Sequence, residues 1–221
     1  MNDLPHNRSY NLPKGLELNI LEYINEHVMN ALYTFLCGLF DIGDIENFES
    51  FRETIGLQAR IPKTKKVICV CRDHQILGAL LGTFLPKTNV GMILYSAVDE
   101  TIQNRGIYTQ MRSAFIGSLF SNIPEGPNYI ISELPSDSRL YTKYMRDWGA
   151  FVAPCNYEIP ATQGLYPRQI ALIIQPIQRL SPPSNTALAA IIHEVYSSVY
   201  QLQLTNDTTY QRVVKSIHPI I

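Results

Sequence analysis

The chain lacks any long apolar run. It has 221 residues, and none of its apolar stretches approaches the roughly 20 consecutive residues of a membrane-spanning helix. Its first residues, Met-Asn-Asp-Leu-Pro, have neither the basic start nor the apolar centre of a secretory signal. These absences favour a cytoplasmic protein with no membrane span as the expectation.

Cysteine and histidine are too few and too scattered to suggest a disulfide framework or a metal site. The four cysteines do not form the pattern of a small secreted protein, and no two histidines have His-x-x-x-His spacing. Cys69 and Cys71 alternate along an apolar segment, which favours buried apolar fillers over a metal pair. Cys155 with a distant histidine could form a nucleophilic pair, but its surroundings give no local support. We therefore expect no metal.

An excess of charge of one sign is also missing. Eighteen Lys and Arg residues stand against 19 Asp and Glu residues, which gives a formal net charge of −1. The chain therefore has no global basic field to attract nucleic acid or an anionic membrane. We expect neither as a partner, and any basic patch must be local.

The apolar content is sufficient for one sizeable core, since 46% of the residues are hydrophobic. We expect one domain over residues 15–178, preceded by a flexible amino-terminal arm over residues 1–14 that contains Pro5 and Pro13. A helical extension is expected over residues 179–221, after Ser-Pro-Pro-Ser at residues 181–184. The extension could pack on the domain, form a contact in a homodimer, or wall a wider tunnel for a ligand.

Apolar periodicity predicts a mixed α/β fold with a largely antiparallel central sheet flanked by helices. Asp44 is expected to cap the second helix, with Glu46 and Glu49 near its amino end. Strands are predicted over residues 15–22, 66–72, 76–84, 90–98, 129–134, 151–159 and 169–176, and helices over residues 24–41, 44–55, 106–120, 138–148 and 188–202.

The most informative segment is the transition from the strand 90–98 through a short polar turn into the helix that begins near Gly106. Glycine leaves room for close approach of a ligand to the backbone. The first N–H groups of the helix have no intrahelical acceptor, so they favour an anion, and Arg105 adds a positive charge beside them. The turn therefore predicts a phosphate-binding site.

The spacing Gln103-x-x-Gly106-x-Tyr108 resembles the Arg/Gln-x-x-Gly-x-Gly/Ala signature of the GNAT superfamily of N-acyltransferases. The predicted order of strands and helices is also similar to the GNAT order, and Tyr108 departs from the Gly or Ala of the family. The resemblance implies that acyl-coenzyme A is the co-substrate and that it contacts the end of the fourth strand and the turn. The residues implied are Ala97, Val98, Gln103, Asn104, Arg105, Gly106, Ile107 and Tyr108.

The resemblance also implies a proton donor on the helix after the fifth strand. Tyr144 and, second, Tyr141 lie in a segment similar to the family's Tyr-x-x-x-Gly-Phe element, although Gly149 follows Tyr144 by five positions instead of four. The two tyrosines are three residues apart and share a helix face, where they also fit an apolar core stripe. Glu133, at the end of the fifth strand, is the first candidate for the base; Asp99 and Glu100 are alternatives.

The implied activity is transfer of an acyl group to a primary amine by direct attack in a ternary complex. Acetyl is the expected group because it is the commonest in the family, and a longer fatty acyl group is the alternative. The acceptor could be a small molecule, an amino acid or a peptide side chain. A catalytically silent GNAT-fold module that binds acyl-coenzyme A or a protein partner is the competing hypothesis.

Overall fold

A computed structural model describes residues 10–41, 43–55, 64–123, 125–161, 165, 167–178 and 181–218. The chain divides into two compact units. One comprises Met1–Thr83 and Ile93–Gly126, and the other comprises Phe84–Met92 and Pro127–Ile221. Two strands contribute residues to both units, so neither unit is one continuous stretch of the sequence.

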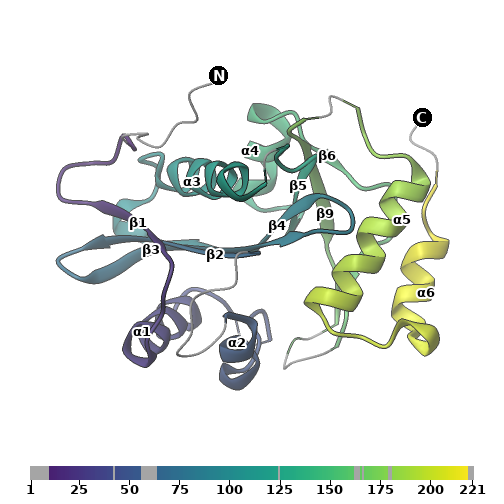
Figure 1. Ribbon diagram of the computed structural model, residues 1–221, viewed down its shortest axis with the longest axis horizontal. Coiled ribbons are helices and arrows are strands. Elements are labelled where there is room, and N and C mark those ends of the chain that lie inside the picture. Colours follow the sequence, from purple (N-terminus) through teal and green to yellow (C-terminus); the bar gives the residue numbers. More distant parts are fainter. Residues whose placement is uncertain are drawn as a thin grey trace. The chain divides into compact units, whose positions relative to one another are not determined.

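The first unit is a set of antiparallel strands with helices on both faces. β1 pairs with β2 and β2 pairs with β3, both antiparallel. Figure 1 shows α1 and α2 on one face of these strands and α3 on the other. The elements are β1 (Glu17–Leu21), α1 (Glu26–Cys37), α2 (Phe48–Ile55), β2 (Lys65–Arg72), most of β3 (Gln75–Leu85), the end of β4 (Val90–Val98), the 3-10 helix η1 (Glu100–Ile102) and α3 (Ile107–Asn122).

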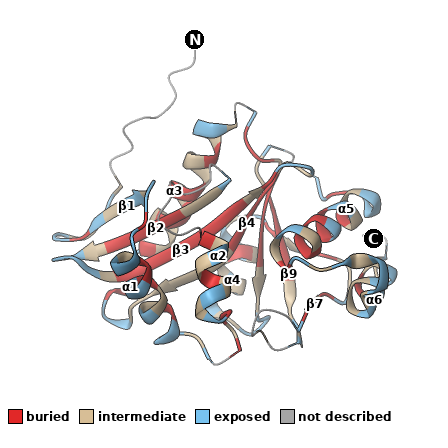
Figure 2. Cartoon of the chain, turned by 60° about the horizontal axis from the view of Figure 1, so that its bottom comes forward, coloured by how far each residue is buried: buried red, intermediate tan, exposed pale blue. Residues whose placement is uncertain are grey.

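The core of this unit follows from the apolar spacing of α1. Asn25 caps α1, because its Oδ1 accepts a hydrogen bond from the Val28 amide at 2.9 Å. Met29, Leu32 and Leu36 then fall on one helix face and are fully buried. They pack with α2 against the side chains of β2 and β3, which form a continuous band of buried residues in Figure 2.

The second unit contains the turn between β3 and β4, three further strands of the main sheet and the carboxyl-terminal helices. α5 and α6 lie side by side (Figure 1), and His193 Nδ1 is 3.0 Å from the Tyr210 hydroxyl. The elements are β5 (Tyr129–Leu134), α4 (Arg139–Asp147), β6 (Phe151–Val152), β7 (Glu158–Ile159), β8 (Arg168–Gln169), β9 (Ala171–Pro176), α5 (Asn185–Glu194), the π-helical turn η2 (Val195–Val199), the 3-10 helix η3 (Leu204–Asn206) and α6 (Thr208–Lys215).

In the described part of the chain, seven strands form one sheet in the order β1-β2-β3-β4-β5-β9-β6, and β7 pairs with β8 alone. β9 lies between β5 and β6 and is antiparallel to both. The predicted fold class, a mixed α/β fold around a largely antiparallel sheet, is confirmed.

Two local predictions were wrong. Asp44 does not cap α2, because the helix begins at Phe48 and the Asn47 Oδ1 accepts from the Ser50 amide at 3.0 Å. The strand expected over residues 151–159 is two short strands, and only the first joins the main sheet. A proline in this segment, Pro154, has no N–H to donate to a sheet ladder, which explains the interruption.

The last predicted helix was correct in its location and wrong in its regularity. It begins at Asn185 and changes at Val195 into a π-helical turn, and α6 follows as a helix that the periodicity did not predict. In Figure 2, buried and exposed residues alternate along α5, as its apolar spacing requires. Residues 1–9 of the expected arm lie outside the described residues, and the domain limits remain predictions.

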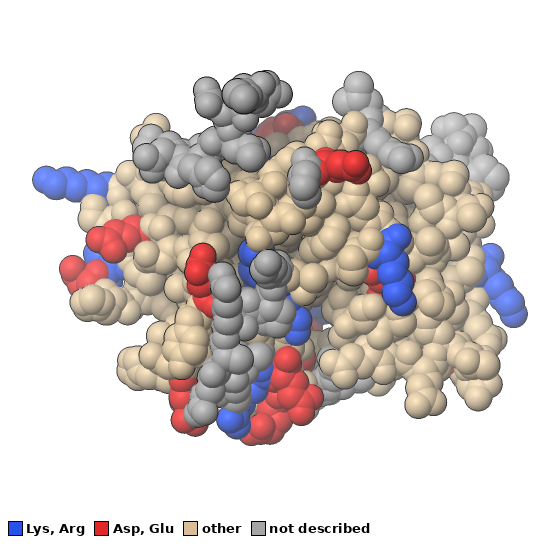
Figure 3. Space-filling view, viewed as in Figure 1, with Lys and Arg blue, Asp and Glu red and all other residues tan. Residues whose placement is uncertain are grey.

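No helix within the described ranges combines the length and apolarity needed to cross a bilayer. On the face drawn in Figure 3, acidic and basic side chains are interspersed among uncharged ones. That distribution agrees with the formal net charge of −1. Charge of one sign therefore does not accumulate over this face.

Candidate functional site

The turn between β4 and α3, residues 99–106, has a well-defined backbone. Asp99 accepts hydrogen bonds from the Thr101 amide at 2.9 Å and the Thr101 hydroxyl at 2.5 Å, which fixes the start of η1. Gly106 then takes the left-handed conformation, with φ 77°, directly before the first residue of α3. Glycine adopts this conformation without the steric cost that other residues carry. Glycine at position 106 therefore satisfies both the sequence motif and the left-handed backbone conformation.

The amino end of α3 is open to a ligand at Gly106. A Cβ atom at Gly106 would have no atom within 4 Å beyond its two neighbours in the chain, and Gly106 makes no side-chain cap to α3. Arg105 is exposed beside it. Because the first amides of a helix lack intrahelical acceptors and carry a partial positive charge, this end suits an anionic group.

The predicted cofactor residues play different parts around this turn. The Gln103 side chain donates to the Val98 carbonyl at 2.9 Å, so it ties the turn to the end of β4. Ile107 is buried, and its side chain packs near Gly78 of β3, so it can offer a ligand only its backbone. Tyr108 is half-buried. The structure therefore gathers Ala97, Val98 and residues 103–108 in one unit, and their contact with coenzyme A remains a prediction.

Tyr144 and Tyr141 differ in their surroundings although both lie on α4. Tyr144 is fully buried, and its hydroxyl is 3.0 Å from the Ser132 Oγ on β5. Its ring meets Trp148 edge-on, with 4.7 Å between ring centroids. Tyr141 is half-buried, and its amide bonds to the helix cap Ser138 at 3.1 Å. Tyr144 therefore contacts β5 through its side chain, and the roles of both tyrosines remain predictions.

Glu133 lies next to Ser132 on β5, so its side chain points to the opposite face of the strand. Its Oε1 accepts from the Tyr157 hydroxyl at 2.5 Å and its Oε2 from the Tyr200 hydroxyl at 2.6 Å. Burial raises the pKa of the Glu133 carboxyl above its ordinary value, while the two hydroxyl donors and the nearby charge of Arg168 lower it.

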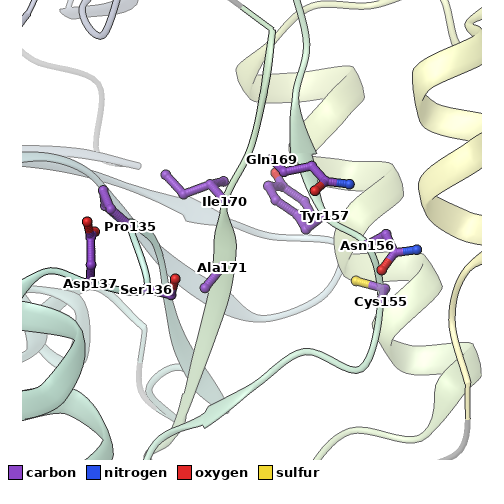
Figure 4. A pocket seen from close by; sticks show the side chains of 9 residues that line it. All are labelled: Pro135, Ser136, Asp137, Cys155, Asn156, Tyr157, Gln169, Ile170 and Ala171. Carbon is purple, nitrogen blue, oxygen red and sulfur yellow. The ribbon is translucent and has the colours of Figure 1, made fainter.

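A pocket of about 510 Å³ opens beside this group. Figure 4 shows Pro135, Ser136 and Asp137 on one side and Tyr157 on the other. Tyr157 connects the two features, because it lines the pocket and its hydroxyl bonds to Glu133. The remaining lining residues are Cys155, Asn156, Gln169, Ile170 and Ala171.

A second buried carboxyl, Glu46, lies just before α2. It is 4% exposed, and burial is the main cause that raises its pKa to about 7. Its Oε2 accepts from the Thr54 hydroxyl at 3.0 Å, and its amide donates to the Tyr95 hydroxyl of β4 at 3.2 Å. The sequence predicts Glu46 as a favourable charge at a helix end, because its burial leaves no signal in the local pattern. Within the described ranges, no group of three or more His, Cys, Asp or Glu residues could hold a metal ion.

No protein-family model matches the chain, and no curated protein sequence matches it. Solved structures do match. A protein from Bacteroides thetaiotaomicron assigned to the GNAT acetyltransferases is 13% identical, with a TM-score of 0.59 over 84% of this chain and 99% of its own. NAA60 of Arabidopsis thaliana, solved in complex with acetyl-CoA, is 12% identical, with a TM-score of 0.56 over 74% of this chain and 99% of its own.

A chain from the structure of the NatC complex bound to Gag peptide and CoA is 14% identical, with a TM-score of 0.56 over 73% of this chain and 98% of its own. These likenesses extend over nearly the whole length of the matched chains, at identities that carry structural information alone. The described chain has the fold of the GNAT-family acetyltransferases.

Proposed function

We propose that the protein is an N-acyltransferase. It moves an acyl group, with acetyl as the first candidate, from acyl-coenzyme A to a primary amine. The observation that carries this proposal is the turn over residues 99–106. An open glycine with positive φ, an exposed arginine and the amino end of a 16-residue helix adjoin one another there. Such a turn suits the pyrophosphate of the carrier, and two proteins with this fold have been solved with acetyl-CoA or CoA.

The proposed reaction needs no covalent enzyme intermediate. The amine nitrogen attacks the thioester carbonyl, a C–N bond forms, the C–S bond breaks and the thiolate leaves. Glu133 accepts the proton that the nitrogen loses, and Tyr144, with Tyr141 as the second candidate, donates a proton to the departing sulfur. Solvent then removes the proton from Glu133 and restores that of the tyrosine, so one amine and one acyl thioester give one amide and one free thiol.

In the second unit, Tyr144 and Glu133 have different hydrogen-bond partners, which supports different roles for the two groups. Ser132, which contacts the Tyr144 hydroxyl, and Glu133 are adjacent on β5 and point to opposite faces. Because the nitrogen and the sulfur are bonded to the same carbon in the tetrahedral intermediate, groups on opposite faces of β5 do not both contact it, and Glu133 receives the proton of the amine through water. The pocket beside Tyr157 offers the acceptor a polar approach, because Asp137, Asn156 and Gln169 line it.

The proposal is tested first by binding and then by turnover. Titration calorimetry with acetyl-CoA should give a defined heat, and Arg105→Glu should weaken binding about tenfold or more by placing a negative charge at the turn. Arg72→Glu is the matched control, because Arg72 is an equally exposed arginine at the end of β2. Thiol release is then measured with a panel of small amines, amino acids and peptides.

Absence of binding to any acyl carrier tried, or equal effects of the two charge reversals, would contradict the proposal. Binding with thiol release in the presence of one class of amine supports it and identifies the acceptor class. Comparison of acetyl with longer acyl carriers in the same assay decides the chain length.

A second candidate is a catalytically silent module that binds acyl-coenzyme A or a protein partner. The observation in its favour is the burial of Tyr144, whose hydroxyl already contacts Ser132. Tight carrier binding without thiol release under any acceptor would establish this candidate. A fall in turnover of about 100-fold or more in Tyr144→Phe, with carrier affinity unchanged, would exclude it.

A further inference from the structure

The carboxylate of Glu133 is held by two tyrosines that come from distant parts of the chain. Tyr157 lies 24 residues further along the sequence, in the segment before β7, and Tyr200 lies 67 residues further along, after the π-helical turn. Each hydroxyl meets a different oxygen of the same carboxylate. The group therefore has one orientation in which both donors are satisfied.

The carboxyl-terminal extension fixes the segment that carries Tyr157. The amide of Asn156 donates to the Ser216 hydroxyl at 2.8 Å, and the amide of His218 donates to the Pro154 carbonyl at 3.1 Å. Arg212 of α6 pairs with Glu158, with 2.8 Å between Nε and Oε1. Contacts from α6 and the residues after it thus bracket Tyr157 on both sides in the sequence.

The same extension supplies Tyr200 directly. Glu194, which is 2% exposed, accepts from the amides of Lys87 and Thr88 at 3.0 and 2.8 Å, and this anchors the end of α5 to the turn between β3 and β4. The π-helical turn follows at once, closed by a hydrogen bond from the Tyr200 amide to the Val195 carbonyl at 3.2 Å. Turns of this kind are rare and frequently occur at functional sites.

Tyr196 fills the space between the two donors. Its ring meets those of Tyr157 and Tyr200 edge-on, each with 5.9 Å between centroids. Its own hydroxyl donates to the Glu158 carbonyl and makes no recorded bond to Glu133. Tyr196 therefore packs the cluster without serving the carboxylate.

We propose that Tyr157 and Tyr200 are positioning residues for Glu133, so that the extension, residues 181–218 of which are described, is a working part of the acyl-transfer site. This inference rests on the proposed function, in which Glu133 is the base. It assigns to the extension a role in catalysis, beyond packing, a subunit contact or an acyl tunnel.

The hydrogen bonds from Tyr157 and Tyr200 affect the pKa of the Glu133 carboxyl. The groups that face Glu133 are Tyr157 before β7, Arg168 on β8, and Tyr196 and Tyr200 on the segment after α5. The two hydroxyl donors stabilise the ionised carboxylate, so the loss of either should raise the Glu133 pKa. At a pH below the raised pKa, less of the base is ionised, and turnover should fall there and recover at higher pH.

The test is the pH dependence of kcat/KM in Tyr200→Phe and Tyr157→Phe, with Tyr196→Phe as the matched control. Each substitution removes one hydroxyl and keeps the ring. In the first two variants we expect kcat/KM near pH 6.5 to fall about tenfold, with recovery to within about threefold of the parent near pH 9. The control should keep the parent profile, because its hydroxyl bonds only to a backbone carbonyl. Titration of the Glu133 side-chain carboxyl by carbon NMR gives a second readout, independent of turnover.

The outcomes separate the two proposals. Suppose that the parent turns over and that both variants keep the acidic limb of the kcat/KM profile, or lose kcat/KM equally at every pH. Either result overturns the positioning role alone. No turnover in the parent with any amine overturns the proposed function and the role that rests on it. An upward shift of the acidic limb and of the NMR titration in both variants, absent in Tyr196→Phe, supports the inference.

Discussion

The two units of the molecule each contain a glutamate whose pKa is raised by burial, and the two are built differently. Among the described residues, the Glu46 side chain in the first unit accepts a hydrogen bond from one hydroxyl, that of Thr54, at 3.0 Å. Its backbone is occupied as well, because its amide meets the Tyr95 hydroxyl and its carbonyl meets the Tyr33 hydroxyl, both at 3.2 Å. Main chain and side chain together join the start of α2 to α1 and β4.

Glu133, in the second unit, receives a separate hydroxyl on each carboxylate oxygen, and one of the donors lines a pocket. Glu46 is connected to an apolar cluster, whereas Glu133 is connected to a cavity of about 510 Å³. The comparison shows that a raised pKa alone does not identify a catalytic base. Substrate must also be able to reach the neighbourhood of the carboxyl. We therefore propose Glu133 as the base and expect a structural role for Glu46.

The largest effect is expected from exchanging each carboxylate for its neutral amide. Glu133→Gln should lower kcat/KM about 100-fold or more, because the amide cannot accept the proton that the amine loses. Glu46→Gln should leave kcat/KM within about threefold of the parent. Steady-state thiol release near pH 8 measures both variants. If Glu46→Gln lowered kcat/KM more than Glu133→Gln did, the base would lie in the first unit, and the assignment of Glu133 would be wrong.

The next effect concerns stability, and it is expected at Glu46. Its folded-state pKa of about 7 exceeds the ordinary value of 4.5, so the folded protein binds more protons than the unfolded chain between these limits. Stability is therefore lost as pH rises through this window, by a total of about 3 kcal/mol. Glu46→Gln removes this cost and should stabilise the protein by about 3 kcal/mol near pH 8.5, with little difference from the parent near pH 4.5.

Urea unfolding at the two pH values measures this change. Glu49→Gln is the matched control, since Glu49 lies in the first turn of α2 with its side chain 75% exposed and paired with Arg52. An exposed pair of this kind contributes about 1 kcal/mol or less. A gain for Glu46→Gln that is the same at both pH values would show that the carboxyl does not titrate as its burial requires.

The local parts of the site could be predicted from the sequence. The strands Val90–Val98 and Tyr129–Leu134 begin and end where the apolar pattern placed them, and α3 begins at Ile107, directly after Gly106. Each of these features is specified by neighbouring residues, because strand alternation and turn chemistry act over a few positions. Glu133 was selected for the same reason, from its place at the end of a strand.

The partners of these residues could not be predicted, because contacts across 24 and 67 residues connect them to Glu133. Nothing in the local pattern of Tyr157 or Tyr200 marks them as donors to that carboxylate. The π-helical turn that brings Tyr200 into place has the same apolar spacing as an ordinary helix. Glu46 was misjudged for the opposite reason: its local setting suited a solvated helix end, while tertiary packing buried it.

The smallest expected effect concerns the Thr54 hydroxyl, which donates a hydrogen bond to Glu46. Thr54→Val keeps the shape of the side chain and removes the hydroxyl that bonds to Oε2. A hydrogen bond to a charged acceptor contributes about 1 kcal/mol more than one to a neutral acceptor. We therefore expect Thr54→Val to destabilise the protein more near pH 8.5, where Glu46 is ionised, than near pH 5, by a difference of about 1 kcal/mol. In the Glu46→Gln background the acceptor is neutral at every pH, so the pH dependence of the Thr54→Val effect should vanish there. Persistence of that dependence in the double variant would show that a group other than Glu46 is responsible.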